Sequence, residues 1–148
     1  MTEGKLNYGK VFVSLDGSDK QDMVFERAIE VAARNGATLY VGHVIDTTTL
    51  ETAGVYPAEL IDALEKAFRE TIQERLDQAK ADPDIAGVEV VVRTGRIRET
   101  IKDEMLDEIH PDLVVCGARG LSPIKYALLG SISTFLLRNA DCDILVVK

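Results

Sequence analysis

The chain contains few cysteines and no long run of apolar residues. Only two of its 148 residues are cysteine, Cys116 and Cys142, and both lie in apolar runs that are typical of buried strands. Because a disulfide framework in a secreted protein needs more cysteines than this, we expect two buried thiols and a cytoplasmic location. No apolar run approaches the roughly 20 residues that a membrane-spanning helix needs. The polar stretch MTEGKLNYG at residues 1–9 lacks the apolar segment of a signal peptide, so we expect no membrane association.

Positive charge is also in the minority. The sequence holds 17 lysines and arginines against 25 aspartates and glutamates, which gives a formal net charge of −8. A chain with this balance is not expected to bind nucleic acid or an anionic membrane through its overall field. An anionic ligand would instead need a local device, such as the backbone N–H groups at the start of a helix.

Residue types that carry acid–base or metal chemistry are scarce. There are two histidines: His43 lies within an apolar run, and His110 stands directly before Pro111. We expect the first to be structural and the second to lie at a helix end, where a cation suits the helix dipole. No group of His, Cys and Asp has the spacing of a zinc site, and no nucleophile–base pair can be placed at the predicted strand ends. The sequence therefore supplies no candidate catalytic residue and no protein metal site.

Strand and helix patterns alternate along the chain. Apolar runs predict five strands, at residues 10–16, 37–46, 88–95, 112–116 and 142–148. Apolar residues at three- and four-residue spacing predict helices between the strands. This alternation predicts an α/β fold, a parallel sheet with helices on both faces, in a single domain over residues 1–148. The helix signals are a capping-box pair at Ser18 and Gln21 with a closing Gly36, Pro57 before a long helix, the stripe Ile97, Ile101, Met105 and Ile109, and a short helix after Ser131.

A glycine-punctuated loop follows the fourth predicted strand. In GARGLSPIKYALLGSIST, residues 117–134, Gly117 and Gly120 remove side chains where a loop would approach a sugar and a phosphate. Gly130 and Ser131 open the last helix, whose first N–H groups favour an anion. A plain turn and a plain helix cap explain each feature singly, but their combination in one loop favours ligand binding. The dinucleotide pattern G-x-G-x-x-G after the first strand and the pattern G-x-x-x-x-G-K-[ST] are both absent.

This loop matches G-x2-G-x9-G-[ST], the ATP-binding signature of the universal stress protein (UspA) family, at Gly117, Gly120, Gly130 and Ser131. VFVSLDGS, LYVGHVID, DLVVCGARG and CDILVVK also resemble segments of that family, in the same order. The resemblance implies a five-stranded parallel sheet in the order 3-2-1-4-5, of the adenine nucleotide alpha-hydrolase-like kind. It also implies a role for each site residue: Asp16 and the backbone of Val44 hold the adenine beside Ser14; Gly117, Arg119 and Gly120 meet the ribose and α-phosphate; and Gly130, Ser131, Ile132 and Ser133 bind the phosphates.

The resemblance implies an ATP-binding regulatory module of the stress response, with at most slow hydrolysis. The alternative is a true ATPase or phosphotransferase at the same site, and a nucleotide-free interaction protein is a weaker third interpretation. Mg²⁺ or Mn²⁺ would arrive with the triphosphate, because Mg²⁺ rarely has a cage made only of protein groups. Arg119 and Lys125 are possible cationic helpers, and the segment DTTTLETAGVYP, residues 46–57, is a candidate lid.

The last predicted strand also predicts an assembly. In the order 3-2-1-4-5 it lies at a sheet edge, and its residues 144–147 are all apolar. Because an exposed apolar edge favours aggregation, proteins normally cover it. We expect a homodimer through residues 142–148, as the family resemblance also implies. The competing arrangement is a monomer in which residues 1–8 fold over this edge.

Overall fold

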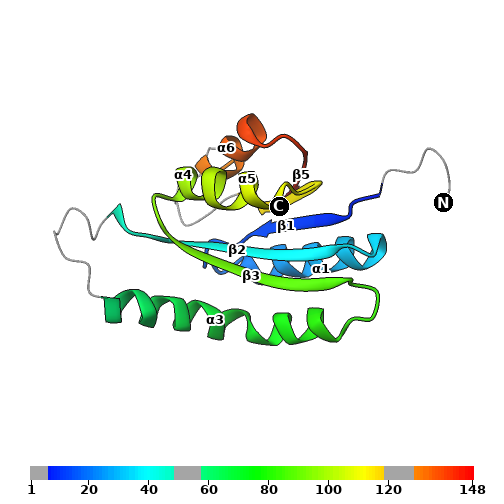
Figure 1. Ribbon diagram of the computed structural model, residues 1–148, viewed down its shortest axis with the longest axis horizontal. Helices are drawn as coiled ribbons and strands as arrows, with labels where there is room; N and C mark the ends of the chain where they lie inside the picture. The colour runs from blue at the N-terminus through cyan, green and yellow to red at the C-terminus, as the bar shows by residue number, and fades with distance from the viewer. Residues whose placement is uncertain (1–6, 49–57, 119–128) are drawn as a thin grey trace.

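The computed structural model describes residues 7–48, 58–118 and 129–148. Its centre is a five-stranded, all-parallel sheet in the order β3-β2-β1-β4-β5, as the sequence predicts (Figure 1). The strands are β1 (Lys10–Ser14), β2 (Thr38–Asp46), β3 (Gly87–Gly95), β4 (Leu113–Gly117) and β5 (Asp143–Val147).

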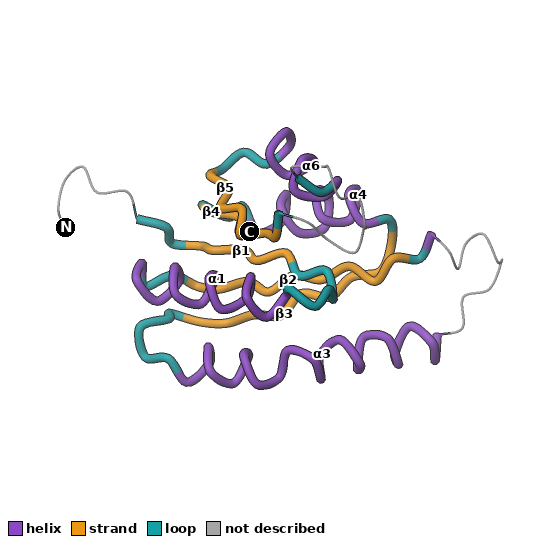
Figure 2. Tube along the Cα trace, turned by 180° about the vertical axis from the view of Figure 1, so that it is seen from behind, coloured by secondary structure: helices purple, strands orange, loops and turns teal. Residues whose placement is uncertain are grey.

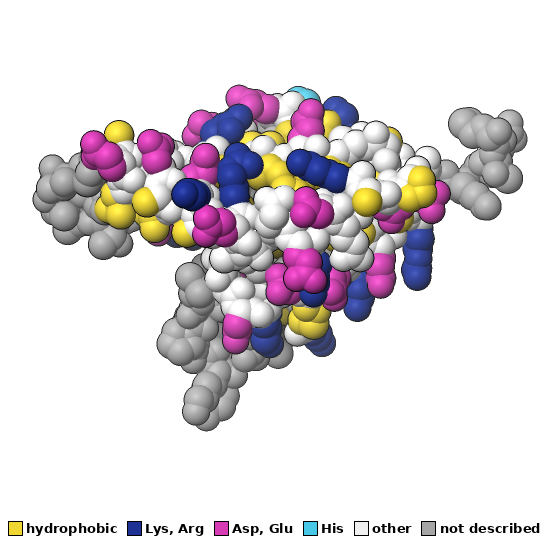
Figure 3. Space-filling view, turned by 90° about the horizontal axis from the view of Figure 1, so that it is seen from below, with side chains coloured by type: hydrophobic (Ala, Val, Ile, Leu, Met, Phe, Trp, Pro, Cys, Tyr) yellow, Lys and Arg dark blue, Asp and Glu magenta, His cyan; other side chains and the backbone are white. Residues whose placement is uncertain are grey.

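Helices cover both faces of this sheet. On one face lie α1 (Gln21–Asn35) and α3 (Ala58–Ala81), and Figures 1 and 2 show both on the same side of the strands. The opposite face carries α6 (Ser131–Asn139) and a continuous helical segment made of α4 (Ile97–Ile101), the π-helix η1 (Lys102–Leu106) and α5 (Asp107–Ile109). On the face seen in Figure 3, from the side of α3, acidic and basic side chains intermingle. In the three described ranges, no helix combines the length and the apolar character that crossing a membrane requires.

The core consists of two apolar layers that share the central strand. Val11 and Val13 of β1 pack toward α1 and α3, whereas Phe12 packs toward η1 and α6. All three side chains are fully buried. A strand buried on both faces is expected to be a continuous apolar run, and Val11–Val13 of β1 form such a run.

The start of α1 differs from the predicted capping box. The helix begins at Gln21, and Lys20 rather than Ser18 is its N-cap residue. The Gln21 side chain accepts the Gly17 N–H (3.0 Å), and Asp16 Oδ1 accepts the Ser18 N–H (2.9 Å). The capping box is therefore wrong, because the carboxylate of Asp16 and the long amide of Gln21 satisfy this turn before the helix starts. At the other end, Gly36 has φ 61°, which confirms the predicted left-handed C-cap.

The third predicted helix contains a π turn. Its apolar stripe repeats every four residues, and each such step overshoots an α-helical turn of 3.6 residues. The wider turn at Lys102–Leu106 offsets this drift, and it keeps Ile101 and Met105 buried against the sheet.

The segment before β1 is tied to distant parts of the chain. The Tyr8 hydroxyl donates to Asp143 Oδ2 (2.7 Å) at the start of β5, and the Tyr8 N–H donates to Asn35 Oδ1 (3.2 Å). Asp112 Oδ2 accepts the N–H groups of Gly9 and Lys10, each at 2.9 Å. The hydrogen bond from Tyr8 thus reaches β5 at Asp143, the first residue of that strand.

Candidate functional site

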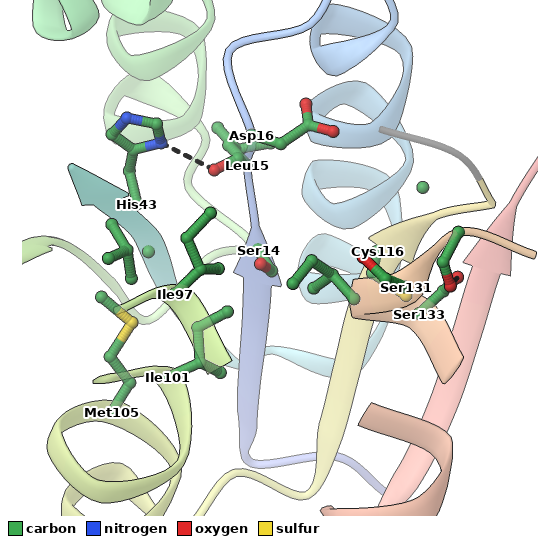
Figure 4. A pocket seen from close by; sticks show the side chains of 15 residues that line it. Ser14, Leu15, Asp16, His43, Ile97, Ile101, Met105, Cys116, Ser131 and Ser133 are labelled. Carbon is green, nitrogen blue, oxygen red and sulfur yellow. Dashed lines mark hydrogen bonds between the residues drawn. The ribbon is translucent and has the colours of Figure 1, made fainter. Parts of the chain in front are cut away.

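A cavity of about 260 Å³ opens at the carboxyl ends of β1, β2 and β4 (Figure 4). It lies on the sheet face that α4 and α6 cover. Ile97, Ile101 and Met105 stand on one side, and Ser131 and Ser133 stand on the other, with the end of β1 between them. This is where the winding of a doubly wound sheet changes direction, and where such sheets bind ligands.

One wall of the cavity is apolar. Ile97, Ile101 and Met105 come from α4 and η1, and they face Val44 near the end of β2. Gly42 lies beneath this wall, where an added Cβ would collide with the Phe12 ring and approach Met105 Sδ to 3.2 Å. The missing side chain at Gly42 thus lets a phenylalanine and a methionine pack under the cavity. A flat heterocycle could lie against such a surface.

The end of β2 leaves backbone groups exposed to the cavity. Ser14, the last residue of β1, pairs with Gly42, and the Leu15 N–H donates to the Gly42 carbonyl (2.9 Å). Because β2 continues to Asp46, Val44 lies beyond the last pairing with β1. Its N–H and C=O on that side have no partner in the described part of the chain. They are available to hydrogen-bond the edge of a planar ligand.

Asp16 is held rigidly beside this edge. Its Oδ1 accepts the Ser18 N–H, and Gly17 takes φ 78°, a left-handed conformation that suits glycine. Asp16 itself is exposed, and its other carboxylate oxygen bonds to none of the described residues. The turn therefore fixes a carboxylate oxygen as a free acceptor at the mouth of the cavity.

His43 lines the cavity near the end of β2, but its ring is turned toward α3 on the opposite sheet face. Its ring stacks on Phe68 of α3, with centroids 3.9 Å apart and planes within 5°. Its Nδ1 lies 2.8 Å from the Leu15 carbonyl oxygen, so Nδ1 carries the proton and donates it (Figure 4). Burial lowers the pKa of His43, although the Leu15 carbonyl and Asp16 act in the opposite direction. The ring is thus neutral near neutral pH, with the contacts of the structural histidine that the sequence predicts.

The start of α6 presents free backbone donors to the cavity. Gly130 is the N-cap residue, with an extended backbone (φ −73°, ψ 170°) and no side chain that could cap the helix. Its own N–H donates to the Ala118 carbonyl (2.6 Å), and its carbonyl accepts the Thr134 N–H (3.1 Å). The N–H groups of Ser131, Ile132 and Ser133 have no acceptor among the described residues. Together with the helix dipole, these three donors form a site suited to an anion.

The hydroxyl of Ser133 is already engaged. Ser133 is 2% exposed, and its Oγ lies 3.2 Å from the Ala118 carbonyl and 3.0 Å from the Gly130 carbonyl. It holds the turn before α6 in place, so the backbone N–H is what Ser133 offers to a ligand. The exposed hydroxyl of Ser131 has no such bond within the described ranges.

Neither cysteine has the lowered pKa of a reactive thiol. Both are free thiols; Cys116 is buried at the cavity floor, and Cys142 is half-buried rather than buried as predicted. Burial raises the pKa of Cys116 to about 11, and burial together with Asp143 raises that of Cys142. Both thiols stay protonated at neutral pH, which makes them poor nucleophiles. Within residues 7–48, 58–118 and 129–148, no three His, Cys, Asp or Glu side chains are grouped to hold a metal ion.

The structure brings most of the predicted site residues together. Residues from both halves of the chain line the one cavity: Ser14, Asp16, Val44, Gly117, Gly130, Ser131, Ile132 and Ser133. The predicted Arg119 and Gly120, the helper Lys125 and most of the candidate lid lie outside the described residues. The sequence interpretation missed the apolar wall of Ile97, Ile101 and Met105, since that stripe was used only to predict a helix. The start of this helix directly after β3, at the carboxyl edge of the sheet, is the signal that could have found it.

The sheet order defines a doubly wound α/β domain, and a cavity lies at its switch point, between the strand ends and two helices. The sequence model of the universal stress protein family matches residues 7–148. A universal stress protein of Staphylococcus aureus is 31% identical over 143 residues, which cover 97% of this chain and 86% of that protein. One from Staphylococcus haemolyticus is 29% identical, with the same two coverages. The chain belongs to the universal stress protein family, as its loop signature and strand segments indicate.

Solved structures agree on the fold. The universal stress protein UspA from Lactobacillus plantarum superposes with a TM-score of 0.82 at 22% identity, covering 97% of this chain and 100% of that one. A universal stress protein solved in complex with cAMP is 29% identical, with a TM-score of 0.63, and covers 97% of this chain and 98% of that one.

Proposed function

We propose that this chain binds ATP and acts as a nucleotide-dependent regulatory module, with at most slow hydrolysis. One observation carries the proposal: an apolar slot and three free N–H donors occupy opposite sides of the same cavity. A nucleotide has the same division, an apolar planar base at one end and anionic phosphates at the other. The cAMP complex of a 29% identical relative supports an adenine nucleotide as the ligand class.

The adenine would lie against Ile97, Ile101 and Met105. Its exocyclic amine is a donor, which suits the free carboxylate oxygen of Asp16 and the carbonyl of Val44. Guanine carries a carbonyl at the corresponding position, where it would face an acceptor. The ribose would follow past Ser14 and Gly117, where the strand ends have small side chains or none.

The phosphates would lie on the start of α6. The N–H groups of Ser131, Ile132 and Ser133 point there together, and the exposed Ser131 hydroxyl adds a fourth donor. Mg²⁺ or Mn²⁺ would be held chiefly by the phosphates and water, since the described residues supply no acidic cage.

The described residues favour binding over catalysis. His43 is turned to the opposite face and the two thiols are protonated, so no described side chain is arranged as a general base at the phosphate end. We therefore propose a regulatory role in the cytoplasm, with a true ATPase or phosphotransferase as the alternative. Single-turnover hydrolysis with enzyme in excess separates the two, because an enzyme would convert the bound ATP within seconds to minutes.

Two measurements test the binding itself. Mass spectrometry of small molecules released from the purified protein should reveal an adenine nucleotide. Calorimetric titration of nucleotide-free protein with ATP and Mg²⁺ should show one site per chain. Absence of ATP binding to folded protein in the second measurement would refute the proposal.

We also propose a homodimer through residues 142–148. β5 pairs with β4 alone within the described residues, and Ile144, Leu145 and Val146 are only half-buried on this edge strand. Light scattering should report a mass near twice the chain's 16.2 kDa. Val146→Lys should shift the mass toward one chain. Leu64→Lys, which places the same charge at an exposed apolar residue of α3, should not. A monodisperse monomer at micromolar concentration would contradict this arrangement.

A further inference from the structure

The opposite edge of the sheet is also open. β3 runs for nine residues, Gly87–Gly95, and pairs with β2 alone in the part of the chain that the structure describes. Figure 1 shows it in front of β2 as the outermost strand. An edge of this length presents a row of unpaired N–H and C=O groups, which is a template for another strand.

The outward-facing groups of β3 can be assigned from one hydrogen bond. The Thr47 N–H donates to the Gly95 carbonyl (3.1 Å), so the backbone of Gly95 faces β2, in agreement with the register that sets Leu39 of β2 opposite Val88. Successive residues of a strand in a parallel ladder point alternately to its two sides. The backbone groups of residues 88, 90, 92 and 94 therefore face away from β2, toward the open side.

The side chains of β3 are self-complementary about the strand's midpoint. Val91 is the central residue of Gly87–Gly95, with the acidic Glu89 two residues before it and the basic Arg93 two residues after it. Glu89 and Arg93 are both exposed and lie on the same face of the strand as Val91. Among the described residues, neither forms an ion pair.

We propose that the open edge of β3 binds β3 of a second copy of this chain, antiparallel and about a two-fold axis through Val91. In this register residue i lies opposite residue 182 − i, so all nine residues of β3 are paired. Glu89 of each copy faces Arg93 of the other, and Val91 faces Val91. The backbone groups that point outward, at 88, 90, 92 and 94, are the ones that hydrogen-bond in this pairing, with 88 opposite 94 and 90 opposite 92. Shifting the register by two residues would leave Glu89 without an opposite charge.

Both faces of β3 can accept this partner. On one face, a groove of about 300 Å³ separates Val91 and Arg93 from Glu104 and Glu108 of the nearby helical segment, so no helix occupies that space. On the other face, Val90 of each copy would lie opposite Val92 of the other, and such β-branched pairs pack well across strands. This contact is independent of the proposed β5 dimer and of nucleotide binding. Where both edges are used, the sheet continues from one molecule into the next.

Complementary charge reversal provides the decisive experiment. In Glu89→Arg, two copies would place arginine against arginine, and in Arg93→Glu, glutamate against glutamate. Each variant alone should dissociate about tenfold or more readily than the parent, because opposed charges across strands change from attractive to repulsive. An equimolar mixture of the two variants restores both ion pairs and should associate as the parent does. Sedimentation velocity over a micromolar concentration series reads all three samples.

Association through β3 must be measured apart from association through β5. The charge-reversal variants are made in Val146→Lys protein, so that association through β5 does not contribute. If that protein precipitates, the variants are made in the unaltered chain, and the association of β5 dimers into larger assemblies is measured instead. Circular dichroism is the folding control for both variants. Calorimetry with ATP is a further control for Glu89→Arg and should be unchanged, because Glu89 pairs with Tyr40 of β2, whereas Arg93 pairs with Val44 at the cavity. Association of the parent that the single variants do not weaken, or weakened variants that the mixture does not restore, would overturn the proposal. The proposal would also be overturned if the protein with native Glu89 and Arg93 did not associate through β3, either as Val146→Lys protein or as the unaltered chain. In that case the β3 edge does not bind a second copy of this chain.

Discussion

The start of α6 allows a sharp test through Gly130→Val. Gly130 has φ −73° and ψ 170°, a region that valine adopts without strain, so the variant should fold. Valine is a poorer N-cap residue than glycine, and the expected loss of stability is about 1 kcal/mol. The branched side chain would project beside the N–H groups of Ser131 and Ile132, where the phosphates are proposed to lie.

The size of the effect follows from the hydrogen bonds that are displaced. A hydrogen bond to a charged group contributes about 1.5–3 kcal/mol. Losing two of the three donors would therefore weaken ATP binding by about 3 kcal/mol or more, which is roughly a hundredfold increase in Kd. The Kd of Gly130→Ala for ATP should lie between those of Gly130→Val and the parent, because alanine adds only a single methyl group.

Calorimetry with two ligands separates this effect from misfolding. ATP should lose most of its affinity for Gly130→Val, whereas adenosine, which has no phosphate, should bind as it does to the parent. Equal loss for both ligands would indicate damage to the whole cavity. A folded Gly130→Val protein with unchanged ATP affinity would refute the placement of the phosphates on α6.

Three further predictions follow from the cavity and its surroundings. GTP should compete with ATP at least about tenfold more weakly, because its base carbonyl would face Asp16, and a lost buried hydrogen bond costs about 1–3 kcal/mol; equal competition would contradict the proposed adenine contacts. Gly42→Ala should lower the free energy of unfolding by about 1–3 kcal/mol in urea titrations, since the new methyl collides with the Phe12 ring. His43 should make stability depend on pH: its folded pKa lies below the ordinary 6.5, so the unfolded chain binds more protons and stability falls as the pH drops below about 6.5. His43→Gln should flatten this part of the curve, and an unchanged pH dependence in that variant would show that other groups produce it.

The sheet was largely predictable because its signals are local. Each strand is an apolar run long enough to span the core, and strict alternation with helices leaves few topologies. The strand order came from the family resemblance, and the glycine loop pointed to the correct edge of the sheet. Contacts between distant segments were not predictable, as Tyr8 and Asp143 show, since 135 residues separate them in sequence.

Two local features were missed for different reasons. The capping box at Ser18 and Gln21 has the right spacing, but the pattern cannot register that Asp16 and Gly17 already form a turn with these residues. The stripe of Ile97, Ile101 and Met105 predicted only a helix, because apolar spacing is the same whether a side chain contacts protein or lines a cavity. Only the position of that helix after β3 distinguishes the two.

The strand order also determines when the cavity comes into existence during synthesis. Residues 7–95 supply β1, β2 and β3 as three adjacent strands, so this half can pair its strands as it leaves the ribosome. β4, α6 and β5 complete the other half, and the last of them ends at Val147. Ser14 and Val44 come from the first half, whereas Gly117 and Ser131 come from the second. A nascent chain therefore has no complete cavity until Ser133 and the start of α6 have emerged, and a product that stalls before β4 would lack one wall of it.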